Sequence, residues 1–318
     1  MHIPDGFFNG ATSFGAGVVA AGGLSGALRQ STARLKDRQI PLAGLVAAFV
    51  FVLQMINFPV IPGMSGHLLG GALAAILMGP SVGVVVVSVV IVLQALLFAD
   101  GGVSALGLNL INMAVVTTLS GWFVFRLVRA PLPPTRRAVL GAAFLAAMIS
   151  VVASAVVFVL EYAIGGVGGV SLTNVLALMA GSHLLIGIGE GFITIAVVGA
   201  VLQARPDLVF GAKDLAYDGT ERLSMRRFWT LAGVAAVILL GLTTFASANP
   251  DGLMWVAEQT GIGLDARSSA TASSPLSDYG TAGLSGVVGT IVAGGIGIVV
   301  TFLLGWGVLK VFRRRSSV

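Results

Sequence analysis

The sequence contains no cysteine, only three histidines and few charged residues among its 318 positions. The absence of cysteine excludes a disulfide framework and a thiolate metal site, so any metal must bind through nitrogen or oxygen. Charged residues make up 10% of the chain, against about a quarter in ordinary soluble domains. Hydrophobic residues make up 56%, and the mean hydropathy is +0.99. This composition excludes a soluble globular protein and predicts a membrane protein.

Several functional signatures are also missing. The sequence has no GxxxxGK[ST] phosphate-binding loop, so we expect this chain to bind no ATP. It has no HExxH zinc motif, no GxSxG elbow and no cysteine nucleophile, so an enzyme has little support. No lysine or arginine precedes Arg29, which is unlike a secretory signal peptide. We therefore expect Met1 to remain on the mature chain.

Long apolar segments predict an all-α polytopic membrane protein. A helix that crosses the hydrocarbon core needs about 20 mostly apolar residues. The segment 67–79 is short and is followed directly by Gly79-Pro80-Ser81, so it could instead be a half-helix or a buried helix. The nine candidate segments are 8–28, 41–57, 67–79, 82–99, 104–125, 138–160, 172–202, 229–246 and 281–307.

The basic residues predict the orientation of these segments. If the N-terminus lies outside and nine segments alternate, 17 of the 18 lysines and arginines fall inside and only Arg267 lies outside. Cytoplasmic loops carry an excess of Lys and Arg, so we expect an outside N-terminus and a cytoplasmic C-terminus. The basic loops are then topology signals, and we expect no nucleic-acid partner despite the net charge of +5. The inside group is Arg29, Arg34, Lys36, Arg38, Arg126, Arg129, Arg136, Arg137, Arg205, Lys213, Arg222, Arg226, Arg227, Lys310 and Arg313 to Arg315.

A polar stretch, 205–227, separates the first seven segments from the last two and predicts a cytoplasmic linker. The last two segments enclose an outside loop, 247–280. Within it, "NPDGLMWVAEQTG" predicts a short helix, with Asn249 as N-cap, Pro250 at the first helical position and Gly261 as the stop. The following "DARSSATASSPLS" predicts a flexible tether.

The opening residues "MHIPDG" contain a possible metal chelate. The free α-amine of Met1, the backbone nitrogen of His2 and its Nδ1 can close a five- and a six-membered ring around one ion. The amide must lose its proton, which Ni(II) and Cu(II) can drive, and square-planar nitrogen sites suit these ions. His67, in the Pro- and Gly-rich stretch "NFPVIPGMSGHLLGG", could fill the fourth corner from the same side of the membrane. The alternatives are an accidental histidine at position 2 and a solvated loop histidine at position 67.

Other polar residues lie in apolar surroundings. His183 and Glu190 are seven residues apart, so they share one helix face, and an ionisable residue inside a span is a functional candidate. Asn109 and Asn112 share another face. These residues could support a metal site from the second shell or simply join helices by hydrogen bonds. The set of supporting candidates is Asn57, Gln94, Asn109, Asn112, His183 and Glu190, with Gln54 beside them.

Four stretches resemble the CbiM/NikM family, the substrate-capture components of energy-coupling factor (ECF) transporters for cobalt or nickel. They are "MHIPDG", "PGMSGHLLGG", "FADGGVSALGLNLINM" and "GSHLLIGIGEGFIT", in order over residues 1–195. The tail, with "NPDGLMWVAEQTG" and "PLSDYG", resembles the small CbiN/NikN partner and its PDGLE motif, with Met254 in place of the glutamate. The resemblance implies a capture domain at 1–204 and a two-span unit at 228–318.

The family's metal site maps onto Met1, His2 and His67, which are all present. The resemblance implies import of Co(II) or Ni(II) across the cytoplasmic membrane, with the ion as substrate. It also implies three partners, a transmembrane coupling protein and two cytoplasmic ATPase subunits, within a lipid bilayer. The sequence does not decide between cobalt, whose import would serve cobalamin synthesis, and nickel. The alternative function is an ion- or proton-coupled carrier in which His183 and Glu190 form a relay.

Overall fold

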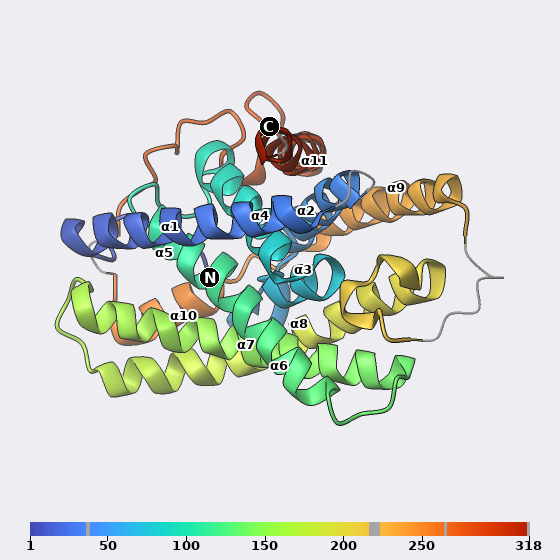
Figure 1. The fold of residues 1–318 in the computed structure, drawn as a ribbon. Helices are drawn as coiled ribbons and strands as arrows, with labels where there is room; N and C mark the ends of the chain where they lie inside the picture. The colour runs from blue at the N-terminus through green and yellow to red at the C-terminus, as the bar shows by residue number, and fades with distance from the viewer. Residues whose placement is uncertain (36–38, 216–222, 264–265, 317–318) are drawn as a thin grey trace.

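The computed structural model describes residues 1–35, 39–215, 223–263 and 266–316. Helices account for most of this part of the chain, and one short antiparallel hairpin interrupts them (Figure 1). In order, the main elements are α1 (Gly10–Arg34), α2 (Ile40–Gln54), β1 (Phe58–Ile61), β2 (Met64–Gly66), α3 (Gly71–Met78), α4 (Pro80–Leu93), η2 (Gln94–Phe98), α5 (Leu106–Asn109), η3 (Leu110–Val116), α6 (Thr117–Arg129), α7 (Arg136–Gly165), α8 (Leu172–Ala204), η4 (Pro206–Leu208), η5 (Phe210–Ala212), α9 (Met225–Leu242), η7 (Thr243–Phe245), α10 (Gly252–Thr260), η8 (Ser277–Tyr279) and α11 (Gly286–Ser316).

Seven helical runs among the described residues are long and apolar enough to cross a membrane. They correspond to α1, α4 with η2, α5 through α6, α7, α8, α9 with η7, and α11. The two remaining predicted segments are helical but short, since α2 has 15 residues and α3 has eight. Eight residues span only about 12 Å, so α3 is a buried half-helix and the count of nine crossings is not confirmed.

The core lies around α3 and α4. All eight residues of α3 are buried, and so are 78% of the residues in the most apolar stretch of α4 with η2. The long helices α7 and α8 form an antiparallel pair on one flank (Figure 1). By contrast, only 17% of the residues in the most apolar stretch of α1, and 6% of those in the stretch of α9, are buried. Their exposed leucine, valine and phenylalanine side chains are suited to contact lipid or another membrane protein.

The last helix joins the rest of the bundle through glycines. α11 packs along α2, and a Cβ placed at Gly44 would lie 2.7 Å from the Phe302 carbonyl oxygen. A Cβ placed at Gly297 would collide with the ring of Phe51. Such small residues let two helix backbones approach closely in a membrane, where packing replaces the hydrophobic effect. α11 therefore holds the C-terminal part of the chain against α2.

The loop between α9 and α11 is bound down at residues 266–280, so the prediction of a flexible tether is wrong for this described part. Hydrogen bonds join Thr271 Oγ1 to the Ala95 carbonyl (2.6 Å) and Ser274 Oγ to the Leu97 carbonyl (2.5 Å). The predicted short helix is α10, which ends at Gly261 in the left-handed conformation (φ 78°). Its N-cap is Asp251 and not Asn249, because Ser65 of the hairpin binds the carbonyls of Asn249 and Pro250 before the helix begins.

Part of the predicted linker and orientation signal lies outside the described residues, namely 216–222 with Arg222, and Lys36 and Arg38. The described parts of the linker are 205–215, which contains the two short 3-10 turns η4 and η5, and 223–227, whose last three residues begin α9.

Candidate metal centre

The N-terminus lies in the middle of the molecule, beside α5, α7 and α10 (Figure 1). Met1, His2 and Ile3 are all buried. Asn109 holds this segment from both sides, because its Oδ1 accepts from the Ile3 amide (2.8 Å) and its Nδ2 donates to the Ile3 carbonyl (3.1 Å). The amide of Gly102 donates to the same carbonyl at 2.8 Å. Asn109, which was predicted as a supporting residue, thus fixes the backbone next to the terminus.

The turn after His2 is anchored at Asp5 and Gly6. Asp5 Oδ1 accepts from the Ser104 amide at 2.7 Å, and the Asp5 carbonyl accepts from the Arg267 amide at 2.8 Å. Gly6 has φ 91°, a conformation that favours glycine. The Pro4-Asp5-Gly6 turn therefore directs the terminus into the bundle, and a strand-like bridge from the loop between α10 and α11 covers it.

The terminal amine meets His67 and a carboxylate from the loop between α9 and α10. The Met1 nitrogen lies 2.5 Å from His67 Nε2 and 2.5 Å from Asp251 Oδ2. His67 Nδ1 donates to the Leu68 carbonyl at 3.0 Å, which leaves the Nε2 lone pair facing the amine. Burial alone would raise the pKa of Asp251, but the terminal ammonium and His67 outweigh it and hold that pKa well below its usual range.

Glu190 fixes the backbone that follows His67. Its two carboxylate oxygens accept from the amides of Leu69 (2.6 Å) and Gly70 (3.0 Å). Gly70 itself has φ 82° and is the N-cap of α3. A buried carboxylate with two backbone donors is well satisfied, so Glu190 acts here as a positioning residue for the loop that carries His67.

His2 points its imidazole into the same space. Its ring centroid lies 5.3 Å from that of His67, and neither of its ring nitrogens has a hydrogen-bond partner. Burial lowers the pKa of His2 to about 4, which keeps the ring neutral and able to bind a metal. The nearest acidic group is Asp100, whose Oδ2 lies 3.5 Å from His2 Nε2.

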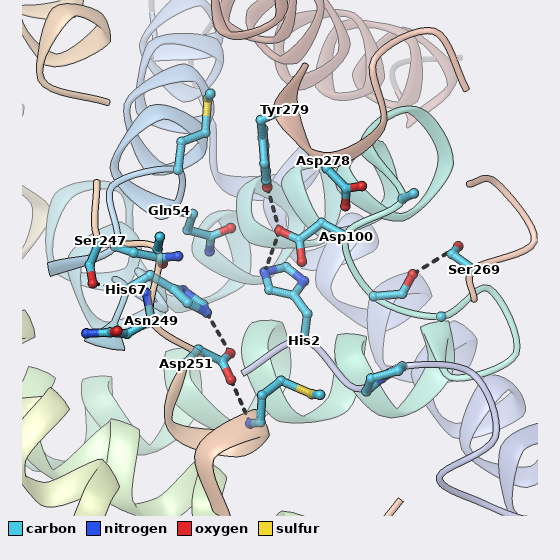
Figure 2. Close-up of a pocket in the computed structure, with 18 of the residues that line it drawn as sticks. His2, Gln54, His67, Asp100, Ser247, Asn249, Asp251, Ser269, Asp278 and Tyr279 are labelled. Atoms are coloured by element: carbon cyan, nitrogen blue, oxygen red, sulfur yellow. Dashed lines mark hydrogen bonds and ion pairs between the residues drawn. The ribbon is translucent and has the colours of Figure 1, made fainter. Parts of the chain in front are cut away.

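Asp100 is in turn held by the C-terminal part of the chain. The Tyr279 hydroxyl donates to Asp100 Oδ2 at 2.5 Å and accepts from Gln94 Nε2 at 2.9 Å. Burial and the neighbouring Asp100 raise the pKa of Tyr279 well above its usual value. Gln94, Tyr279, Asp100 and His2 thus form a chain of polar groups that reaches from η2 to the terminus. Figure 2 shows its last three members, Tyr279, Asp100 and His2.

His183 lies near the amine but does not join Glu190. Its Nδ1 donates to the Met179 carbonyl at 2.8 Å, and its Nε2 has no hydrogen-bond partner. A cavity of about 10 Å³ lies between His183, Met1, His67 and Asp251, about the volume that admits one water molecule. Two helical turns, about 10 Å, separate His183 from Glu190, and each side chain binds elsewhere. The geometry does not form the relay of the carrier hypothesis.

Two predicted supporting residues lie apart from this cluster. Asn112 donates to Glu161 Oε2 at 2.5 Å and joins η3 to α7. Asn57 lines the outer cavity, where its carbonyl accepts from the Ser247 amide at 2.7 Å. Gln54 Nε2 donates to the Leu69 carbonyl at 2.8 Å, so it supports the His67 loop.

A cavity of about 670 Å³ lies above the cluster (Figure 2). Four carboxylates line it, those of Asp5, Asp100, Asp251 and Asp278, together with the single cationic side chain Arg267. Such a charge distribution favours entry of cations. Within the described residues, no three His, Cys, Asp or Glu side chains form a metal site by themselves. A metal here would also need the terminal amine and backbone nitrogen.

Sequence reasoning missed Asp251, Asp100 and Tyr279. Asp251 stands inside the PDG stretch, for which the sequence predicted Asn249 as the N-cap and Met254 as the position of the family's glutamate. Asp100 stands in "FADGG", and a carboxylate directly after a long apolar run was the available signal.

Known proteins resemble both parts of this chain. Residues 2–208 match the family described as the cobalt uptake substrate-specific transmembrane region, CbiM, and residues 226–314 match the PDGLE domain. The chain is 33% identical over 314 residues to the protein of Archaeoglobus fulgidus named for fused nickel transport, NikMN, an alignment that covers 98% of this chain and 99% of the relative. It is 34% identical over 207 residues to the cobalt transport protein CbiM 2 of Pelobacter propionicus, covering 64% of this chain and 91% of the relative.

A solved structure agrees with these matches. The crystal structure of a truncated transition metal transporter aligns with a TM-score of 0.56 and 27% identity, covering 64% of this chain and 98% of that chain. The alignment to NikMN spans both matched regions, so the chain carries them in the same order as that relative. This chain is therefore a multi-pass membrane protein that belongs to the CbiM family of cobalt uptake substrate-specific transmembrane regions, with a PDGLE domain following in the same polypeptide.

Proposed function

We propose that this chain is the metal-capture component of an ECF transporter that imports Co(II) or Ni(II). The ion binds to the Met1 amine nitrogen, the backbone nitrogen and Nδ1 of His2, and Nε2 of His67. The observation that carries the proposal is the 2.5 Å approach of the amine to His67 Nε2, deep inside the bundle. A buried amine beside an imidazole lone pair is a preorganised donor pair.

The arrangement of His2 fits this chemistry. Both of its ring nitrogens are buried without a hydrogen-bond partner, which is costly for a polar group unless a ligand completes the site. When Nδ1 binds the ion, Nε2–H can donate to Asp100, as metal-binding histidines commonly do to carboxylates. Binding displaces protons from the amine and from the His2 amide, because metal ligands must be deprotonated.

The orientation proposed for this function places the N-terminus outside and the C-terminus in the cytoplasm. The cavity above the cluster then opens outside and admits the ion, while α1, α9 and the other exposed apolar helices face lipid or a partner. The half-helix α3 completes one passage together with the hairpin that precedes it, so nine helical segments include two short ones. The domains are a capture domain at 1–204, a linker at 205–227 and a CbiN/NikN-like unit at 228–318.

Energy for import comes from outside this chain, since its sequence contains no phosphate-binding loop. The proposal therefore includes a transmembrane coupling protein and two ATPase subunits on the cytoplasmic side. Homologues named for nickel and for cobalt transport support the choice of cargo. Planar four-nitrogen coordination favours Ni(II) on geometry, while the same ligands serve Co(II).

An extension before Met1 tests the metal site. A Gly-Ser dipeptide placed there converts the amine into an amide, so we expect nickel binding by the purified full chain to be lost. The control is the same dipeptide after Val318, which should leave binding unchanged. His2→Ala should also abolish binding. Undiminished nickel binding by the extended chain or by His2→Ala contradicts the proposed site.

A further inference from the structure

The two carboxylate oxygens of Asp251 have different partners. Oδ1 accepts from the Met254 amide at 2.9 Å and caps α10. Oδ2 lies 2.5 Å from the Met1 nitrogen and 3.5 Å from His67 Nε2. The second oxygen is thus free of the helix and faces two of the proposed nitrogen donors. Figure 2 shows one of these approaches, that of Asp251 to His67.

These separations are close to those of ligands on one ion. Donors bound at about 2.0–2.2 Å from a first-row metal, with angles of about 90–110°, lie about 2.8–3.6 Å from one another. Small movements bring the amine, His67 Nε2 and Asp251 Oδ2 to such spacing. From this geometry we propose that Asp251 is an oxygen ligand of the captured divalent cation, supplied by the C-terminal unit in addition to the four nitrogens. The inference rests on the proposed function.

The charge of the site supports this assignment. The Met1 side chain is 1% exposed and that of Asp251 is 14% exposed, so the ammonium and the carboxylate pair at the largely buried end of the cavity. A cation that takes the amine nitrogen as ligand replaces the ammonium. The carboxylate would then be buried without a counter-charge, which is strongly unfavourable, unless the cation itself becomes its partner. Coordination by Asp251 gives its carboxylate a positively charged partner both without the cation, when that partner is the ammonium, and with it.

The position of Asp251 is fixed from both sides. Before it, the Ser65 amide and hydroxyl donate to the carbonyls of Pro250 (2.8 Å) and Asn249 (2.7 Å). After it, a Cβ placed at Gly252 would lie 2.5 Å from Ile186 Cδ1 and 3.1 Å from His183 Cε1. The segment is therefore locked between the hairpin that carries His67 and helix α8, which preorganises the carboxylate.

X-ray absorption of the nickel-loaded full chain tests the proposal. Planar four-coordinate Ni(II) gives a strong pre-edge shoulder, which a fifth ligand removes. We expect the unmodified chain to lack this shoulder, and Asp251→Asn and Asp251→Ser to show it with an affinity about 10–100 fold lower, the usual cost of losing a group around a metal. Asn and Ser both cap helices, so α10 should remain formed.

Asp278→Asn is the matched control, because it removes a carboxylate from the same cavity without touching the amine or His67. Its spectrum should match that of the unmodified chain. If the unmodified chain already shows the planar spectrum, or if Asp251→Asn leaves the spectrum unchanged, Asp251 is not a ligand, while nickel binding lost in His2→Ala still upholds the proposed function. If the unmodified chain binds no nickel, the proposed function itself fails.

Discussion

Tyr279 acts at a distance on the imidazole of His2. Its hydroxyl binds Asp100, and its ring stacks on Phe98 with 5.0 Å between centroids. Asp278 and Tyr279 both have positive φ (52° and 55°), a strained conformation for residues other than glycine. The strained backbone lies where the chain turns Tyr279 toward Asp100. Tyr279 thus supports the carboxylate that orients His2.

Tyr279→Phe tests this role, because it removes the hydroxyl and keeps the stacked ring. We expect nickel affinity to fall about tenfold, since Asp100 loses a donor and holds His2 Nε2–H less firmly. Competitive titration with a coloured chelator measures the affinity, and the melting temperature checks that the fold is intact. Equal affinity in a chain of unchanged stability would show that Tyr279 only fills space.

At this scale, sequence reasoning could predict donors but not their carboxylate partners. The proposed chelate of Met1 and His2 uses atoms that are adjacent in the chain, so it can be drawn from two residues. Asp251 meets Met1 across 250 positions, and no local spacing encodes such a contact. Glu190 was predicted as a buried functional or structural carboxylate. Its binding to the Leu69 and Gly70 amides depends on a loop whose path the sequence does not show.

Among the elements, α11 is held to α2 by the close approach at Gly44 and Gly297. A larger side chain at Gly297 must push against Phe51, because a single Cβ there already collides with its ring. Around Gly307, on the same helix, nothing lies within 4 Å of such an atom. The two glycines therefore offer a matched pair on one helix.

Gly297→Val should loosen the C-terminal unit, whereas Gly307→Val should not. With a protease site engineered into the linker 216–222, the cut C-terminal fragment should remain bound during purification in the unmodified chain and in Gly307→Val. It should separate in Gly297→Val, because valine cannot fit against Phe51. Gel filtration after cleavage provides the measurement. Retention of the fragment in Gly297→Val would contradict the importance of this contact.

Helix positions were predictable because apolar runs are a strong signal, and all nine segments fall on helices. The lengths of the helices were not predictable. The apolar segment 67–79 looks continuous in the sequence, but α3 begins only at Gly71, after the loop that carries His67. The cap of α10 was also misassigned. Asn249 and Asp251 are both good N-caps, and the hydrogen bonds of Ser65 to the carbonyls of Asn249 and Pro250 decide between them.

The molecule as a whole should have its acidic cavity outside. The native chain has no cysteine, so single cysteines can be labelled without background. We expect an impermeant maleimide on intact cells to label Ser268→Cys, in the outside loop, and not Leu132→Cys, in the connection between α6 and α7. Positive charge near Leu132 favours the cytoplasmic side. The reverse labelling pattern would invert the proposed orientation, and permeabilised cells should label both positions.

The pairing of Met1 with Asp251 also has a consequence for the order in which the protein is made. Synthesis proceeds at about 5–20 residues per second, so Asp251 leaves the ribosome roughly 12–50 s after Met1. For most of that time the chain already contains the amine, His2 and His67 but lacks the segment that covers them. Carrying that segment on the same polypeptide makes closure an intramolecular event with a high effective concentration. The site is thus completed last, and a chain interrupted before α10 would expose it unfinished.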